Sequence, residues 1–169
     1  MSSVAAPFTP AGRQRFLAPD RGRLWDEARV SAATPGSTSD TTLRLALPEV
    51  PELQAGQYYV LRLATPSPPG AVEQAYSVSS SPYPPSAEIE ITVREVTGGR
   101  ISPVLVHHVQ VGDLLHVRGP FGFLTWSEDD GGPLLLLGAG SGVAPLMSIV
   151  RYVAARRATP PSRVSTPTA

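Results

Sequence analysis

Three closely spaced glycines, Gly138, Gly140 and Gly142, follow a run of leucines at residues 134–137. The leucines predict a buried strand, and Pro145 after the glycines is suited to the first turn of an apolar helix. A strand-to-helix turn of this kind presents free backbone N–H groups and the positive end of the helix dipole to an anion. We therefore expect the run to bind the phosphate groups of a nucleotide.

The residues around this run exclude two other kinds of chemistry. A P-loop needs a lysine after its last glycine, and the chain contains no lysine. Ser141 does not form the nucleophile elbow of a hydrolase, because Ala139 and Val143 stand where that motif has glycines. We assign Ser141 to the glycine run as a binding residue; a tight strand-to-helix turn without a ligand is the alternative.

A tyrosine among hydroxyl side chains, at residues 74–80, provides a second kind of chemistry. The ring of Tyr76 is able to stack on a flat heterocycle, and Ser77 is able to hydrogen-bond the heteroatoms of that ring. The alternative is an ordinary strand that ends in a serine-rich turn.

A short helix is expected after the two glycines at residues 98–99. Ser102 is suited to its N-cap, Pro103 to its first position, and Gly112 lies just past its expected end. The start of this helix is a second candidate site for an anion.

Composition excludes several classes of function. The 14 basic and 14 acidic residues give a formal net charge of zero, so neither nucleic acid nor an anionic membrane is an expected partner. Cysteine is absent and the 3 histidines are scattered, so no metal site is expected. No apolar run reaches transmembrane length and no secretory leader is apparent, so a cytoplasmic location is expected.

Short alternating segments separated by proline and glycine turns must position these residues. Six strands are expected, at residues 25–33, 41–47, 57–64, 76–79, 88–96 and 114–118. This spacing predicts a mainly β chain that forms an antiparallel barrel or sandwich with one short helix. Residues 1–24 and 158–169 are expected to be a disordered arm and tail.

Taken in order along the chain, these motifs resemble the ferredoxin–NADP reductase superfamily of flavoproteins over about residues 25–157. The segments that carry the resemblance are 55–58 (Ala-Gly-Gln-Tyr), 76–77 (Tyr-Ser), 98–102 (Gly-Gly-Arg-Ile-Ser), 111–113 (Val-Gly-Asp), 119–122 (Gly-Pro-Phe-Gly) and the glycine run 138–145. The ordered set is far more specific than any of its members.

The resemblance implies a domain organisation. A six-stranded antiparallel FAD-binding barrel would occupy residues 25–126, followed by a linker at 127–132. Residues 133–157 would begin an NAD(P)-binding α/β domain, of which the chain holds a single βα unit. One such unit cannot bury its own strand edges and helix face. We therefore expect it to dock on the barrel, to pair with a partner chain that covers it, or to be locally unstable.

The resemblance also implies roles for particular residues. Tyr76 would stack on the isoalloxazine and Ser77 would lie near its N5, so these two are the expected catalytic residues. The expected cofactor-binding residues are Gln74, Tyr76, Ser77, Val78, Val93, Gly99, Arg100, Ile101, Ser102, Gly138, Gly140, Ser141, Gly142 and Pro145. The implied cofactor is FAD, with FMN less favoured, and NAD(P)H is the implied donor.

One residue departs from the family pattern inside the expected site. The family usually has arginine where this chain has Gln74, so a flavin phosphate loses a charge-assisted partner worth about 1.5–3 kcal/mol. Arg94 and Arg100 are the candidate replacements.

The function implied is electron transfer from NAD(P)H through FAD to an unidentified acceptor. A non-catalytic flavin-binding or regulatory module is the first alternative, because the expected donor site is incomplete. A β-barrel interaction domain without a cofactor is the second alternative.

Overall fold

Six antiparallel strands make up one sheet in the computed structural model, which describes residues 25–66 and 69–158. The predicted arm, and the predicted tail apart from Ala158, lie outside the described residues. The strands are β1 (Asp26–Ser37), β2 (Asp40–Ala46), β3 (Tyr58–Pro66), β4 (Pro69–Ser77), β5 (Glu88–Arg94) and β6 (Leu114–Phe121). Their order in the sheet is β4-β3-β6-β1-β2-β5, and the mainly β prediction is confirmed.

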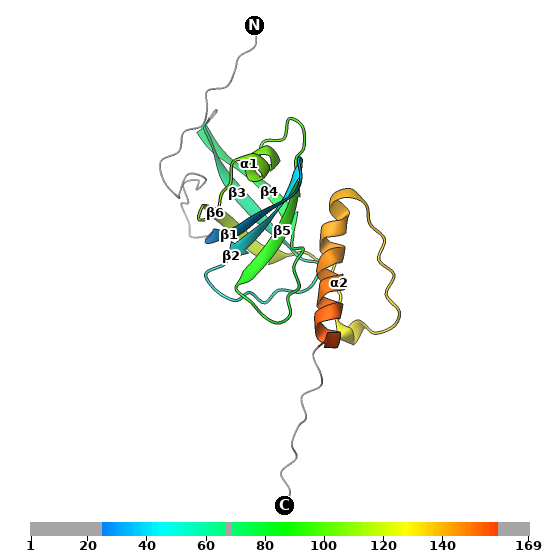
Figure 1. Cartoon of the computed structure of the whole chain (residues 1–169). Coiled ribbons are helices and arrows are strands. Elements are labelled where there is room, and N and C mark those ends of the chain that lie inside the picture. The colour runs from blue at the N-terminus through cyan, green and yellow to red at the C-terminus, as the bar shows by residue number, and fades with distance from the viewer. Residues whose placement is uncertain (1–24, 67–68, 159–169) are drawn as a thin grey trace, which may run out of the picture.

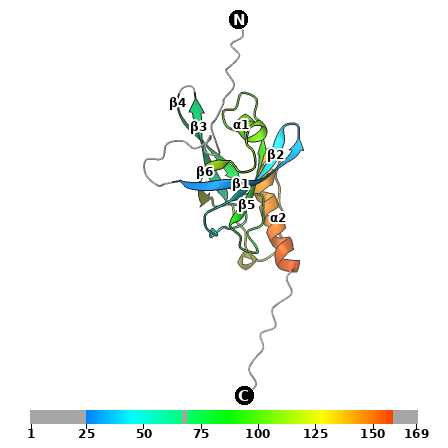
Figure 2. The ribbon, with the colours of Figure 1, turned by 60° about the vertical axis from the view of Figure 1, so that its left-hand side comes forward.

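The sheet closes into a barrel where its two edge strands meet. Val78, directly after β4, forms an antiparallel bridge with Ile91 of β5. The Ser79 N–H donates to the Glu90 carbonyl at 2.7 Å and strengthens the closure. Closing a sheet in this way removes its unpaired edges, and Figures 1 and 2 show the barrel from two sides.

Alternating side chains along the strands fill the barrel. In β5, Ile89, Ile91 and Val93 are fully buried, and the residues between them face outward. This two-residue period places one side of each strand in the core and leaves the other side free to build a site.

The short helix α1 (Ser102–His107) covers one end of the barrel and buries Leu105 (Figure 1). The prediction that Ser102 caps this helix is wrong, because the N-cap is Ile101 and no side chain bonds there. The Ser102 hydroxyl instead accepts the Val96 N–H at 3.0 Å. Gly112, with φ of 96°, shapes the turn into β6 rather than ending the helix.

Strand β4 begins at Pro69, well before the expected start at residue 76. Prolines suggested a turn over residues 66–70, but β3 and β4 pair as far as Pro66 opposite Pro69. Proline is tolerated at the first residue of a strand, which is the position of Pro69 in β4. The longer β4 gives the barrel an additional wall on which a site is built.

The strand expected at residues 134–137 is absent, and residues 131–139 contain no strand. Leu135 and Leu137 are 80% and 82% exposed. A strand needs a neighbour to satisfy its backbone groups, and the described residues offer none beside this segment. Two short 3-10 turns, η1 (Glu128–Asp130) and η2 (Gly140–Gly142), flank it.

Helix α2 (Val143–Ala158) lies alongside the barrel, with the preceding segment looping out on its far side (Figure 1). It begins at Val143, so Pro145 sits within its first turn rather than opening it. Ser148 and Ile149 are buried, whereas Val150 is 45% exposed. Helix α2 of this region contacts the barrel through Ser148 and Arg151, whereas Leu135 and Leu137 before it are exposed.

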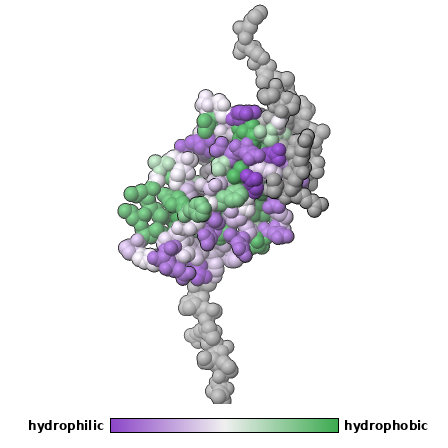
Figure 3. Space-filling model, turned by 180° about the vertical axis from the view of Figure 1, so that it is seen from behind, coloured by the Kyte–Doolittle hydropathy of each residue, from purple (hydrophilic) through white to green (hydrophobic). Residues whose placement is uncertain are grey.

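An apolar patch remains on the outside of this region, visible as the green area in Figure 3. It is formed by Leu134, Leu135, Leu137, Val143, Met147 and Val150, each at least 36% exposed. No helix among the described residues is long and apolar enough to cross a membrane.

Candidate functional site

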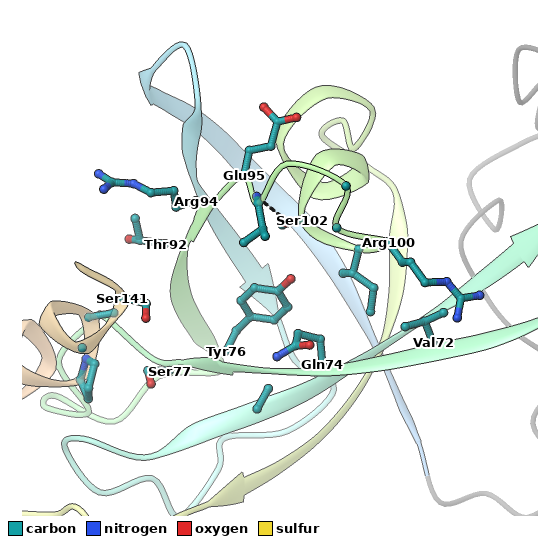
Figure 4. A pocket seen from close by; sticks show the side chains of 18 residues that line it. Val72, Gln74, Tyr76, Ser77, Thr92, Arg94, Glu95, Arg100, Ser102 and Ser141 are labelled. Atoms are coloured by element: carbon teal, nitrogen blue, oxygen red, sulfur yellow. Dashed lines mark hydrogen bonds between the residues drawn. The ribbon is translucent and has the colours of Figure 1, made fainter. Parts of the chain in front are cut away.

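A pocket of about 800 Å³ opens between β4, β5 and the start of α2 (Figure 4). The two strands meet at the Val78–Ile91 bridge and diverge from it, and the pocket occupies the space between them. Its volume lies in the range of small-molecule sites.

The first wall is β4. Val72, Gln74 and Tyr76 share one face of the strand through its two-residue period, and all three line the pocket. The Tyr76 side chain stands in the middle of the pocket in Figure 4, with Ser77 on the α2 side. Burial raises the pKa of Tyr76 to about 12, so its hydroxyl is neutral and able to donate at neutral pH.

The second wall is the end of β5. Thr92 and Arg94 project outward from this strand and line the pocket together with Glu95. Arg94 forms an ion pair with Asp40 at 3.6 Å, and Glu95 contacts Nε2 of His107 at 2.9 Å. Both charges are therefore shared with neighbours outside the pocket.

A compact loop at residues 98–102 closes the pocket beside α1. The Gly99 N–H donates to the Val96 carbonyl at 2.7 Å, and Ser102 accepts from the Val96 N–H. A Cβ at Gly99 would lie 2.8 Å from the Val96 oxygen and 2.9 Å from the Ser102 hydroxyl. This close approach explains the glycine, because any side chain would force the loop open.

The third wall comes from α2 and the turn before it. Ser141, Gly142, Ala144 and Pro145 line the pocket opposite the 98–102 loop. A Cβ built on Gly142 meets no atom within 4 Å, so no packing contact requires a glycine there. Docking of α2 therefore decides how wide this side of the pocket is.

The charge of the pocket favours an anionic ligand. Arg94 and Arg100 lie on opposite sides of Tyr76 in Figure 4, and Arg100 and Gln74 are on the same side. Arg100 forms no ion pair with another described residue, whereas Arg94 has Asp40. An arginine without a carboxylate partner is available to a phosphate.

Most of the residues expected at the site come together here. Those that line the pocket are Gln74, Tyr76, Ser77, Gly99, Arg100, Ile101, Ser102, Ser141, Gly142 and Pro145. Val78 and Val93 are fully buried and lie in the barrel core. Gly138 and Gly140 lie on the exposed segment before α2 and are outside the pocket lining. A Cβ at Gly138 would come 2.6 Å from Cδ1 of Leu146, so packing against α2 accounts for that glycine.

Several lining residues are absent from the set that the sequence predicted to bind the cofactor. They are Val72, Ala75, Thr92, Glu95, Val96, Gly98 and Ala144, with Arg94 foreseen only as a replacement for the missing arginine. The two-residue alternation of side chains along a strand is the sequence signal that could have identified some of these residues. Val72 lies four residues before Tyr76, so the two share one face of the strand. Thr92 and Arg94 alternate with the buried residues of β5 and therefore lie on its outer face.

No group of three or more potential ligands for a metal ion occurs among the residues that the structure describes. The polar groups that line the pocket are a tyrosine, hydroxyls, a glutamine, a glutamate, glycine backbone and two arginines.

Comparison with known proteins places the fold in a family. The oxidoreductase FAD-binding domain model matches residues 27–126. The chain belongs to this family, and its resemblance to the ferredoxin–NADP reductase superfamily is confirmed.

Three similar proteins illustrate the relationship. The reductase component of the naphthalene 1,2-dioxygenase system of Pseudomonas putida is 34% identical over 109 residues, 64% of this chain and 31% of the relative. Reductase component 2 of terephthalate 1,2-dioxygenase from Comamonas sp is 31% identical over 150 residues, 88% of this chain and 40% of the relative. The FAD/NAD-binding domain of a nitric oxide dioxygenase from Vibrio cholerae superposes with a TM-score of 0.73 at 25% identity, covering 81% of this chain and 60% of that one.

The chain thus spans between 31% and 40% of the length of these two curated relatives. The matched family model ends at residue 126, before α2.

Proposed function

We propose that the pocket binds FAD and that the chain is the flavin-binding part of an oxidoreductase. The observation that carries this proposal is that Tyr76, the 98–102 loop and the start of α2 line one pocket in a chain of this family. The donor set suits the cofactor, because it combines an aromatic face with arginines and glycine backbone.

Tyr76 would pack its neutral phenol ring against the isoalloxazine, and Ser77 would hydrogen-bond the edge of the ring system. Arg100 would take a phosphate of the cofactor, since it lies on the Gln74 side of Tyr76 and is not ion-paired with a described residue. Gly99, Ile101 and Ser102 would complete the phosphate end of the site.

When bound, FAD accepts a hydride from NAD(P)H and passes the electrons to an acceptor. The start of α2 would form the donor side, with Ser141, Gly142 and Pro145 excluding water from the ring. Gly138 and Gly140 would face the nucleotide from the exposed segment. The names of the relatives point to an oxygenase-linked redox protein as the kind of acceptor.

The domain assignment follows from the same proposal. Residues 25–126 would be the FAD-binding barrel, 127–132 a linker, and 133–157 the beginning of the NAD(P)-binding domain. Among the described residues this last region contributes a helix without the strand that normally precedes it.

A non-catalytic flavin-binding module is the second candidate. The exposed, unpaired segment at residues 131–139 favours it, because a nicotinamide site needs a formed strand-to-helix turn. Both candidates require the same flavin site.

Fluorescence titration of FAD with the full chain tests the proposal. Tyr76→Ala removes the ring and is expected to weaken FAD binding by about tenfold, because an aromatic stack contributes about 0.5–1.5 kcal/mol beyond area burial. Tyr76→Phe keeps the ring and is the matched control, with binding near that of the original chain. Absence of saturable FAD binding, or equal affinity of both variants and the original chain, would overturn the proposal.

A further inference from the structure

Helix α2 is held against the barrel by a cluster of polar contacts just beyond the pocket. The Ser148 hydroxyl donates to the Ser80 carbonyl at 2.7 Å, and Nη1 of Arg151 donates to the Ser79 carbonyl at 2.7 Å. The same Nη1 lies 3.3 Å from Oε2 of Glu90 in β5. Three chain segments therefore meet at Arg151.

Glu90 is shared between two arginines, one on each carboxylate oxygen. Arg44 of β2 donates through Nε at 3.2 Å and Nη2 at 2.8 Å to Oε1, which leaves Oε2 to Arg151. The barrel thus fixes the direction of the carboxylate before α2 engages it. Such an anchored acceptor restrains the arginine in one position.

Apolar packing alone does not fix this helix. Val143, Met147 and Val150 of α2 face outward at 41%, 36% and 45% exposure. On the barrel side, only Pro145 and Ile149 are buried apolar residues of α2, and Ser148 beside Ile149 is a buried polar residue. Polar contacts are directional, so the orientation of the first half of α2 depends on them.

The polar cluster is connected to the pocket through both of its partners. Ser79 follows Tyr76 and Ser77 by a few residues, and the Ser79 N–H is bonded to the Glu90 carbonyl of β5. On the other side, Val143, the first residue of α2, lies eight residues before Arg151, which is about 12 Å along the helix. A tilt of α2 about this cluster would move the Ser141–Pro145 wall of the pocket.

We propose that Arg151 is a positioning residue that sets the distance between the start of α2 and the Tyr76–Ser77 segment. It acts by joining the Ser79 carbonyl and the Glu90 carboxylate through one nitrogen. The consequence for a bound flavin rests on the proposed function, whereas the position of α2 can be measured without any ligand.

The absence of native cysteine allows the position of α2 to be measured by pairs of spin labels. Labels on Glu27→Cys in β1 and Met147→Cys on the outer side of α2 report the distance between barrel and helix by double electron–electron resonance. Arg151→Ala is expected to broaden the distance distribution at least about twofold, because α2 samples more orientations.

Two further variants distinguish positioning from general loss of structure. Arg151→Lys is expected to narrow the distribution again in part, because both contacts of Arg151 come from one nitrogen and an ammonium keeps the positive charge and the donors. Arg157→Ala, on an exposed residue of the same helix, is expected to leave it narrow. Thermal unfolding of the barrel should be similar in all the variants.

The absorption spectrum of bound flavin tests whether the position of α2 affects the flavin. With FAD bound, Arg151→Ala should lose the resolved shoulder of the flavin absorption band that an enclosed ring shows, and Arg151→Lys should keep it. Equal distance distributions for the original chain and Arg151→Ala, or no rescue by Arg151→Lys, would overturn the inference. Failure of every variant to bind FAD would contradict the proposed function and leave the distance result to decide the role of Arg151.

Discussion

Tyr76 is the residue on which the proposed site most depends, and its ionisation offers a direct test of its surroundings. Burial raises its pKa from 10.0 to about 12. The unfolded chain therefore loses this proton at lower pH than the folded chain does. Stability from the buried neutral phenol is complete below pH 10 and is lost as the pH rises towards 12.

We predict that the free energy of unfolding falls less steeply above pH 10 in Tyr76→Phe than in the original chain. The difference in slope should correspond to about one proton. Urea unfolding at a series of pH values measures it. Parallel curves for the two proteins would show that Tyr76 is as accessible in the folded chain as in the unfolded one.

Gln74 is the residue that departs from the family pattern, and restoring a charge there is informative. It lines the same pocket as Arg100 and lies on the same side of Tyr76. Gln74→Arg is expected to tighten FAD binding by about tenfold, through one added charge-assisted phosphate contact. Riboflavin has no phosphate, and its affinity should be unchanged. An equal gain for both ligands would contradict a phosphate role for this side of the pocket.

At the residue scale, the sequence was most informative where the type of residue is chemically unusual. Tyr76, Ser77 and the Gly99–Ser102 segment stood out by type and order, and they meet in one pocket. Ser102 was predicted to cap the helix, but its hydroxyl accepts a hydrogen bond from the Val96 N–H instead. A cap and a loop-closing bond need the same residue type, so sequence could not separate them.

At the scale of elements, the contact between the turn at Gly56 and the segment after β6 requires a glycine in that turn. Gly56 has φ of 103°, and a Cβ there would collide with the Leu124 carbonyl oxygen, close to Ile149 of α2. Gly131 has φ of 61° and a Cβ there meets nothing within 4 Å. Substitution of Gly131 therefore tests backbone strain alone, whereas substitution of Gly56 tests strain together with a steric collision.

Gly56→Ala is predicted to lower the free energy of unfolding by about 2–3 kcal/mol or more, because strain and collision add. Gly131→Ala, the matched control, should cost less, about 1–2 kcal/mol, because only the backbone conformation, with φ of 61° and ψ of −173°, opposes the side chain. Chemical denaturation gives both values. Similar costs at the two positions would contradict close packing of the Gly56 turn against Leu124.

Element boundaries show where local signals were insufficient. The alternation in β5 predicted its start correctly at residue 88, because buried and exposed residues follow the strand period without interruption. The start of β4 was predicted too late, because the prolines near residue 66 indicated a turn. In the structure the β3–β4 hairpin continues through these prolines. The strand at 134–137 was expected from four leucines, but a strand also needs a neighbour, and no local signal reports one.

At the scale of the whole molecule, the apolar patch on α2 and the segment before it exposes several large hydrophobic side chains to solvent. Leu135 and Leu137 are 80% and 82% exposed beside the outward residues of α2 (Figure 3). Patches of this kind mark interaction sites or association-prone surfaces. We predict that the chain alone self-associates at micromolar concentration and that the double change Leu135→Asp and Leu137→Asp returns it to a monomer. Sedimentation velocity measures both, and a monomeric original chain would contradict the prediction.

The same region limits the proposed donor side. With no strand formed at residues 131–139, the nicotinamide would be poorly held beside the flavin. NADH and NADPH should therefore reduce FAD bound to this chain slowly, whereas dithionite should reduce it readily. Anaerobic stopped-flow absorbance separates the two, and rapid, saturable reduction by either nucleotide would show that α2 and its preceding turn suffice.

The central claim is that one pocket between β4, β5 and α2 binds FAD, and hydrogen exchange with and without FAD locates the ligand directly. We predict that FAD slows amide exchange in three separate segments at once, residues 74–77, 98–102 and 141–145. Exchange at residues 40–46 of β2, away from the pocket lining, should be unaffected. Protection confined to other segments, or no change in exchange at saturating FAD, would contradict the account.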